Sequence, residues 1–287
     1  MHQNSQANTI RISQYSALAY LAPAQDDYTM THNSDTYATK PTSLLHEKDG
    51  ELSLHFGFPT IQSRMLRADP ERLILDYTRS MMGFLLFQPN PERIGMIGLG
   101  GGSLAKYCRR KLPESDFTAI ELLPEIIALR DEFGIPEDAS HFRIICADGA
   151  EYVRDKNEIF DVLLIDGFDK DGQPRQLCSQ AFYDACFGAL RQGGVLVVNL
   201  CAEDTGYGSY VARIRESFNE KVLVIEADEG DNKIVFAKKC ERFPPGFNEL
   251  TERLRILEAK HPVDLDKTAQ KILRQQQSRR SRPRKRR

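Results

Sequence analysis

The amino-acid sequence predicts an α/β fold with a mostly parallel sheet that helices cover on both faces. Two observations lead to this prediction. From residue 94 onward, short apolar segments alternate with helical patterns. These segments are nearly continuous in apolar residues, which is typical of strands buried on both faces of a parallel sheet. A cluster of glycines, at positions 98 and 100 to 102, follows the first segment and suits a Rossmann-like turn from strand to helix.

The main sheet is expected to have seven strands, at residues 94–97, 117–120, 142–146, 162–165, 195–200, 222–227 and 234–238. The linker 228–232 between the last two is too short for a helical crossover, so these strands should form an antiparallel hairpin at one edge. Seven strands ending in such a hairpin resemble the Rossmann-like sheet of class I S-adenosylmethionine-dependent methyltransferases.

The remaining segments suggest smaller units around this sheet. Residues 1–41 read as a polar, poorly ordered lead-in. Residues 42–92 read as a small N-terminal β region, with a hairpin in 42–60 and a helix over 70–87 that Asp69 caps and Pro70 begins. Residues 93–240 form the Rossmann-like catalytic domain. Residues 241–275 give amphipathic helices, and 276–287 a basic, disordered tail.

Composition and charge restrict the function. No apolar run is long enough to span a membrane, and the polar start lacks a secretory signal, so a cytoplasmic location is expected. The six cysteines include no C-x-x-C pair and the histidines show no ligand spacing, so no metal site is expected.

The charge is unevenly placed along the chain. The segment 274–287 holds eight Lys or Arg residues and no acid, and removing them from the net charge of −2 leaves −10 for residues 1–273. A negative body suits cationic small molecules and argues against a nucleic-acid partner.

The glycine turn carries the first functional signal. Gly98 and its neighbours end an apolar strand, and Glu121 ends the next one, about 20 residues further on. Glycines let backbone N–H groups approach a ligand closely, and the carboxylate can accept hydrogen bonds from ribose hydroxyls. The pattern predicts a site for an adenosine-containing cofactor, although tight turns also use glycine for steric reasons alone.

Further acidic residues follow the next two strands. Asp148 and Gly149 come after the third strand, and Asp166 and Asp169 come at and after the end of the fourth. The carboxyl ends of parallel strands line the ligand crevice of an open α/β sheet, so these carboxylates should lie together. A single aspartate in such a place can also be a helix cap or a turn former.

Taken together, the glycine loop, Glu121, Asp148-Gly149, the D-x-x-D of Asp166 and Asp169, and the Ala-Phe-Tyr of residues 181–183 resemble the spermidine synthase (polyamine aminopropyltransferase) family. The resemblance covers residues 44–240 and includes Gln62 and Tyr77. It implies a transferase of polyamine biosynthesis that moves an aminopropyl group from decarboxylated S-adenosylmethionine to an amine such as putrescine and releases methylthioadenosine.

The resemblance also implies roles for individual residues. Glu121 would hold the ribose hydroxyls, Asp148 the adenine amino group, and Asp166 would face the attacking amine and later accept its proton. Asp169 would bind the far ammonium of the diamine. Tyr77 would take part in catalysis with Asp166 and bind the amine substrate with Asp169, and Gln62 with the glycines Gly98, Gly100, Gly101, Gly102 and Gly149 would complete the nucleoside site.

Two positions depart from the family pattern and leave alternatives open. The aspartate usual in the glycine loop is replaced by Gly101, and the proline usual after the second aspartate by Lys170. Gly101 would tolerate the carboxylate of intact S-adenosylmethionine, so methyl transfer is a second hypothesis. A non-catalytic nucleoside-binding or interaction protein is the third. The expected partners are a small amine and, as the common homo-oligomer, a second copy of the chain.

Overall fold

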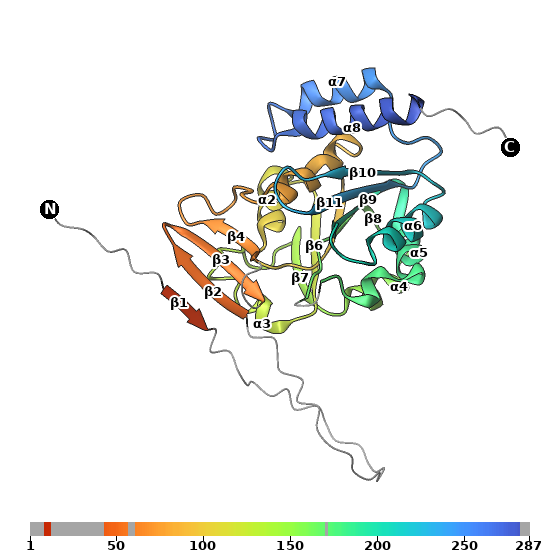
Figure 1. The fold of residues 1–287 in the computed structure, drawn as a ribbon. Helices are drawn as coiled ribbons and strands as arrows, with labels where there is room; N and C mark the ends of the chain where they lie inside the picture. Colours follow the sequence, from red (N-terminus) through yellow and green to blue (C-terminus); the bar gives the residue numbers. More distant parts are fainter. Residues whose placement is uncertain (1–8, 13–42, 57–60, 170–171, 282–287) are drawn as a thin grey trace, which may run out of the picture.

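The main sheet has the seven expected strands. The computed structural model describes residues 9–12, 43–56, 61–169 and 172–281. The strands are β5 (Arg93–Ile97), β6 (Asp116–Glu121), β7 (Phe142–Cys146), β8 (Phe160–Ile165), β9 (Leu190–Cys201), β10 (Val222–Glu226) and β11 (Asn232–Lys238). They lie in the order β10-β11-β9-β8-β5-β6-β7 (Figure 1). The pairings among β5 to β9 are parallel, whereas β11 is antiparallel to β9 and to β10, which confirms the edge hairpin.

Helices cover both faces of this sheet because successive strand residues point to opposite sides. On one face, Leu163 and Ile165 of β8 belong to a core shared with α4 (Gly149–Arg154), α5 (Gln180–Ala189) and α6 (Tyr207–Ser217). On the other face, Val162 and Leu164 pack in a core with α2 (Ser103–Lys111) and α3 (Pro124–Ile127). The nearly continuous apolar composition of the strands follows from this double coverage.

A second sheet, of four antiparallel strands, lies beside the first (Figure 1). Its strands are β1 (Thr9–Ile12), β2 (Ser43–Lys48), β3 (Glu51–Phe56) and β4 (Ile61–Leu66), in that order. The predicted hairpin is β2–β3, turning at Asp49 and Gly50, which both have positive φ. The sequence did not predict β1, which pairs with β2 inside the segment expected to be a poorly ordered lead-in. The rest of that segment lies outside the described residues.

The helix predicted over 70–87 starts later than expected. It consists of α1 (Asp76–Met81), which runs into the 3-10 helix η1 (Met82–Leu86). Asp69 closes a turn with Leu66 and does not cap a helix, and the residue before α1 is Leu75, without a side-chain cap. The guanidinium of Arg79 donates to the carbonyl oxygens of Leu73 and Ile74. The strand-to-helix connection thus occupies the segment that the proline signal assigned to the first helical turns.

Two helices follow the sheet, as expected. They are α7 (Phe247–Leu257) and α8 (Leu265–Ser281), which lie against one another, with α8 packed on β10 and η1 (Figure 1). Because α8 extends to Ser281, the prediction of disorder from residue 276 is wrong for 276–281, while 282–287 lie outside the description. In the described part of the chain, no helix has the length and apolar character needed to cross a membrane.

Candidate active site

A cavity of about 570 Å³ opens at the carboxyl ends of β5, β6, β8 and β9, between the main sheet, β4, α1 and the β10–β11 turn. The topology explains its place, since the crevice of an open α/β sheet lies outside the carboxyl ends of its strands. Nine predicted site residues line this one cavity: Gln62, Tyr77, Gly98, Gly100, Glu121, Asp148, Gly149, Asp166 and Asp169.

The glycine turn divides into two parts. Gly98 has a φ of +89°, and a Cβ there would collide with the carbonyl oxygen of Asp166, so only glycine fits. Gly100, with a φ of +53°, faces the cavity. These two glycines bring the turn close to any ligand in the cavity.

Gly101 and Gly102 lie behind the cavity wall and are not among its lining residues. A Cβ on Gly101 would lie 2.6 Å from the hydroxyl of Ser63 and 2.7 Å from the ring of Phe133. Gly102 begins α2 with a φ of +64° and would collide with Ile135. Their described positions give these glycines a packing role in the turn, which differs from the expected ligand contact.

Glu121 is held in place by the glycine turn itself. Its side chain is only 7% exposed, and its two oxygens accept hydrogen bonds from the backbone N–H groups of Leu99 (2.8 Å) and Leu123 (2.9 Å). Burial raises the pKa of this carboxyl, and the backbone donors partly offset that effect. A carboxylate can accept about four hydrogen bonds, and the backbone N–H groups of Leu122 and Gly100 also act on Glu121, so a ribose would share this carboxylate with the backbone of the turn.

Asp148 is the N-cap of α4. Its Oδ1 accepts from the backbone N–H groups of Ala150 (2.7 Å) and Glu151 (3.2 Å). The helix-cap interpretation of this residue therefore holds, and it does not exclude ligand binding, because Asp148 also lines the cavity and its Oδ2 is not engaged by the cap. Its neighbour Gly149 packs against Ile97 where a Cβ would collide.

Asp166, directly after β8, has the most elaborate surroundings. Its Oδ2 accepts from the hydroxyl of Tyr77 (3.3 Å) and its Oδ1 from the side-chain amide of Asn199 (2.9 Å). Asn199, which is 2% exposed, accepts in turn from the amide of Asn232 (2.9 Å). Burial raises the pKa of Asp166 to about 6, although the hydrogen bonds from Asn199 and Tyr77 lower it. Burial beside Asp166 also raises the pKa of Tyr77 well above 10, so its hydroxyl stays protonated.

Sequence reasoning missed several lining residues: Ser63, Asn199, Cys201, Glu203, Asp231 and Asn232. One signal was available, because Asn199 is the single polar residue within the apolar strand segment 195–200. The others depend on pairing between distant strands. Asn232 stands opposite Cys201 in the β9–β11 ladder, which carries the β10–β11 turn to the cavity.

The cavity has a strongly one-sided charge. Six carboxylates line it, namely Glu121, Asp148, Asp166, Asp169, Glu203 and Asp231, and no lysine or arginine does among the described lining residues. Asp169 lies at the exposed rim. Lys170 falls outside the described residues. Within the described ranges, no group of three His, Cys, Asp or Glu residues is arranged to hold a metal ion. The arrangement favours a ligand with several positive charges.

Comparisons with known proteins agree with this geometry. The family model of the spermine/spermidine synthase domain matches residues 75–213. The polyamine aminopropyltransferase of Chromobacterium violaceum is 36% identical over 225 residues, which are 78% of this chain and 86% of that protein. A spermidine synthase solved with the transition-state analogue AdoDATO aligns with a TM-score of 0.57 and 24% identity, over 75% of each chain.

The fold is also that of methyltransferases. Human methyltransferase-like protein 13, solved in complex with SAH, aligns with a TM-score of 0.60 and 22% identity over 64% of this chain and 91% of that one. At such identities the structural matches establish the fold only. The identity to the Chromobacterium enzyme over most of both chains goes further, and on that ground the chain belongs to the spermine/spermidine synthase family.

Proposed function

We propose that this protein is an aminopropyltransferase that uses decarboxylated S-adenosylmethionine as donor and a small amine as acceptor. The single observation that carries the proposal is that six carboxylates line the cavity, while none of its described lining residues is a lysine or an arginine. Decarboxylated S-adenosylmethionine carries a sulfonium and an ammonium, and an alkyl diamine carries two ammonium groups near neutral pH. Both substrates therefore match the charge of this cavity.

The nucleoside fits the half of the cavity built by β5, β6 and α4. Glu121 shares its carboxylate between the backbone of the turn and the ribose hydroxyls, and Asp148 Oδ2 offers an acceptor to the adenine amino group. Leu122 lies between them along the chain, is 50% exposed and lines the cavity, so it gives a flat base an apolar contact. Gly98 and Gly100 add no side chain of their own to the turn beside the donor.

The amine fits the other half, beside Asp166. In the reaction the attacking ammonium of the acceptor first gives one proton to the carboxylate of Asp166, and the lone pair that this frees forms a bond to the propyl carbon next to the sulfonium. The carbon–sulfur bond breaks with its electron pair going to sulfur, which leaves neutral methylthioadenosine. The nitrogen ends as a secondary ammonium of the product, and the single proton taken up by Asp166 passes to solvent once the product has left. The protein mainly aligns the reactants and holds that proton acceptor.

The surroundings of Asp166 suit a proton acceptor. An ordinary aspartate is a poor base toward an alkyl amine, whose pKa is about 10. Burial raises the pKa of Asp166 to about 6 and narrows this difference, while the hydrogen bonds from Tyr77 and Asn199 fix the direction of both oxygens. Asp169, Glu203 and Asp231 also line the cavity, and we assign this group of carboxylates to the distant ammonium of the acceptor.

Methyl transfer from intact S-adenosylmethionine is the main competing hypothesis. Its donor carries an additional carboxylate, which would enter a cavity lined by carboxylates and by no described cation. Gly101, whose lack of a side chain had favoured this hypothesis, lies behind the wall against Ser63 and Phe133. The charge of the cavity thus favours the decarboxylated donor.

Calorimetry with S-adenosylmethionine, its decarboxylated form and methylthioadenosine tests the donor. We expect the decarboxylated form to bind more tightly than the carboxylated one by about 10-fold or more, since one like-charge contact costs at least about 1.4 kcal/mol in a buried site. A clear preference for the carboxylated form would contradict the proposal. Failure of all three to bind would favour an interaction protein without catalysis.

A further inference from the structure

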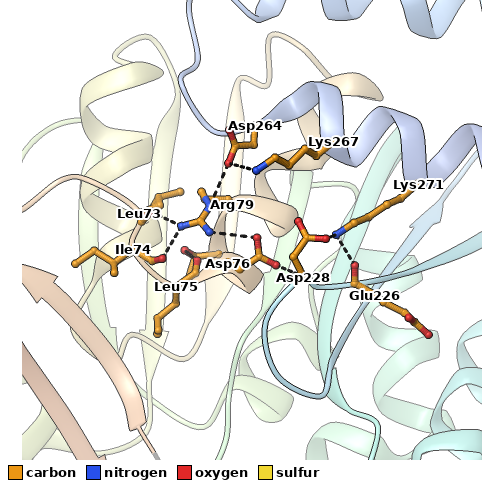
Figure 2. A network of polar contacts seen from close by, with 11 residues as sticks. Leu73, Ile74, Leu75, Asp76, Arg79, Glu226, Asp228, Asp264, Lys267 and Lys271 are labelled. Atoms are coloured by element: carbon orange, nitrogen blue, oxygen red, sulfur yellow. Dashed lines mark hydrogen bonds and ion pairs between the residues drawn. The ribbon is translucent and has the colours of Figure 1, made fainter.

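The helix that carries Tyr77 is fixed by a buried carboxylate on the neighbouring residue. Asp76 is 6% exposed and follows directly before Tyr77 in α1. Its Oδ1 accepts from Arg79 (3.2 Å), and its Oδ2 accepts from the backbone N–H of Asp228, in the turn between β10 and β11 (Figure 2). One side chain thus joins α1 to the turn across 152 residues of sequence.

Helix α8 holds both partners from the outside. Lys271 lies 2.6 Å from Asp228 Oδ1 and donates to the carbonyl oxygen of Glu226 (2.8 Å). Asp264, just before α8, lies 3.6 Å from the guanidinium of Arg79 (Figure 2). The C-terminal helix therefore bridges α1 and the β10–β11 turn, and the contacts place the turn at a fixed distance from Tyr77.

The same turn leads back to the reaction centre. A few residues after Asp228, Asn232 begins β11 and donates to Asn199, which donates to Asp166. Tyr77 donates to the other oxygen of Asp166. The chain of contacts is closed: from Asp166 through Tyr77 and Asp76 to the turn, and from the turn through Asn232 and Asn199 back to Asp166.

We infer that Asp76 is a positioning residue for catalysis, which holds the two hydrogen-bond donors of Asp166 in register by tying α1 to the β10–β11 turn. This inference rests on the proposed function, because it takes Asp166 as the proton acceptor. The site residues inferred from the sequence did not include Asp76, Arg79, Asp228 or Lys271. None of the four lines the cavity, so their effect on the reaction passes through Tyr77 and Asn199.

A carboxylate is needed at this position because two donors meet there. An apolar side chain would remove the only acceptor that the described residues offer to the N–H of Asp228. An asparagine could satisfy only one of the two donors with its single oxygen. The geometry of the ring is therefore sensitive to the loss of one oxygen atom, even where the packing of α1 is unchanged.

The test compares Asp76→Asn with Asp161→Asn in the full-length protein. Asp161 is a matched control: it is 8% exposed, accepts from the backbone N–H groups of Glu92 and Arg93, pairs with Arg191, and lies in β8 at the end away from the cavity. We expect Asp76→Asn to lower kcat between about 5-fold and 100-fold, since small misplacements of reacting groups cost up to about 100-fold. The Kd for methylthioadenosine should stay unchanged, and Asp161→Asn should lose stability while keeping kcat.

Equal effects of the two substitutions on kcat, or an unchanged kcat in a folded Asp76→Asn protein, would overturn the inference. If Asp76→Asn does not fold, Lys271→Met serves as the second variant, because it removes the contact of α8 with Asp228. It should lower kcat by a smaller factor and leave nucleoside binding unchanged. An unchanged kcat in Lys271→Met would also overturn the inference.

A crystal structure of the folded variant, Asp76→Asn or else Lys271→Met, separates this inference from the proposed function. We expect the contact between the Tyr77 hydroxyl and Asp166 to be lost or lengthened in the variant. If that contact persists unchanged, the positioning role is wrong. If the contact is lost but the wild-type protein forms no methylthioadenosine, the proposed function is wrong and the structural connection stands.

Discussion

Replacing Asp166 by asparagine should abolish turnover and at the same time stabilise the protein above pH 6. Burial raises the pKa of Asp166 from 3.8 to about 6. At about 1.4 kcal/mol for each pH unit, the ionised carboxylate costs the folded state up to about 3 kcal/mol. Asparagine has the same shape, accepts from Asn199 and can donate to the hydroxyl oxygen of Tyr77, so it removes the charge and keeps a hydrogen bond at both positions, while the Tyr77 hydroxyl changes from donor to acceptor.

The sign of the pH dependence follows from proton binding. Between pH 4 and 6 the folded wild-type protein holds a proton on Asp166 that the unfolded chain has already lost. The contribution of this group to the free energy of unfolding therefore falls as pH rises through that window, and it is constant above it. The stability advantage of Asp166→Asn should be absent near pH 4 and fully developed by pH 7.

Urea denaturation at several pH values measures this difference, and methylthioadenosine release measures turnover. We expect a loss of about 100-fold to 10,000-fold in kcat, the usual contribution of general acid–base catalysis, with nucleoside binding retained. Asp161→Asn, on the same strand but away from the cavity, should lose stability at pH 7. The reasoning is refuted if Asp166→Asn is less stable than the wild type at pH 8, or if it keeps its turnover.

A pH profile and two further substitutions test other parts of the site. In the wild-type protein, kcat/KM should decline with unit slope below about pH 6 as Asp166 of the free enzyme takes up a proton, and a flat profile down to pH 5 would remove Asp166 from its role. Gly101→Asp should lower the free energy of unfolding by about 1 to 3 kcal/mol in urea denaturation and should not tighten donor binding, because Ser63 and Phe133 fill the space of the new side chain. The control Gly208→Asp, where a Cβ meets nothing within 4 Å, should change the free energy of unfolding little. Tighter donor binding by Gly101→Asp would show that the loop can open. Glu121→Gln should weaken methylthioadenosine binding about 10-fold or more in calorimetry, since the single oxygen of glutamine cannot serve both backbone donors and the ribose. The control Glu125→Gln should bind methylthioadenosine like the wild type. Unchanged binding by Glu121→Gln would place the ribose elsewhere.

The sequence predicted those parts of the site that depend on strand ends. Apolar runs located all the strands of the main sheet, and the topology of a parallel sheet then brought Glu121, Asp148 and Asp166 to one cavity. A carboxylate that directly follows a strand can be recognised from the local sequence, because ligands of an open α/β sheet bind at the carboxyl ends of its strands.

The parts that were missed depend on contacts between distant segments. Asn232 reaches the site only because β11 pairs with β9, and Asp76 meets Asp228 only because the β10–β11 turn lies against α1. The start of α1 was misplaced because Arg79 binds the carbonyl groups of the preceding segment, which the Asp69-Pro70 signal could not show. The place of Gly101 behind the wall follows from the packing of Phe133, which lies 32 residues further along and has no local signature.

Mass spectrometry of the products tests the central claim most directly. The protein is incubated with an equal mixture of decarboxylated and intact S-adenosylmethionine and with putrescine as acceptor, and Asp166→Asn serves as the control. We predict methylthioadenosine and an amine extended by one aminopropyl group, both formed at least about 100-fold more slowly with the variant. Formation of S-adenosylhomocysteine and a methylated amine would contradict the assignment of this cavity to aminopropyl transfer.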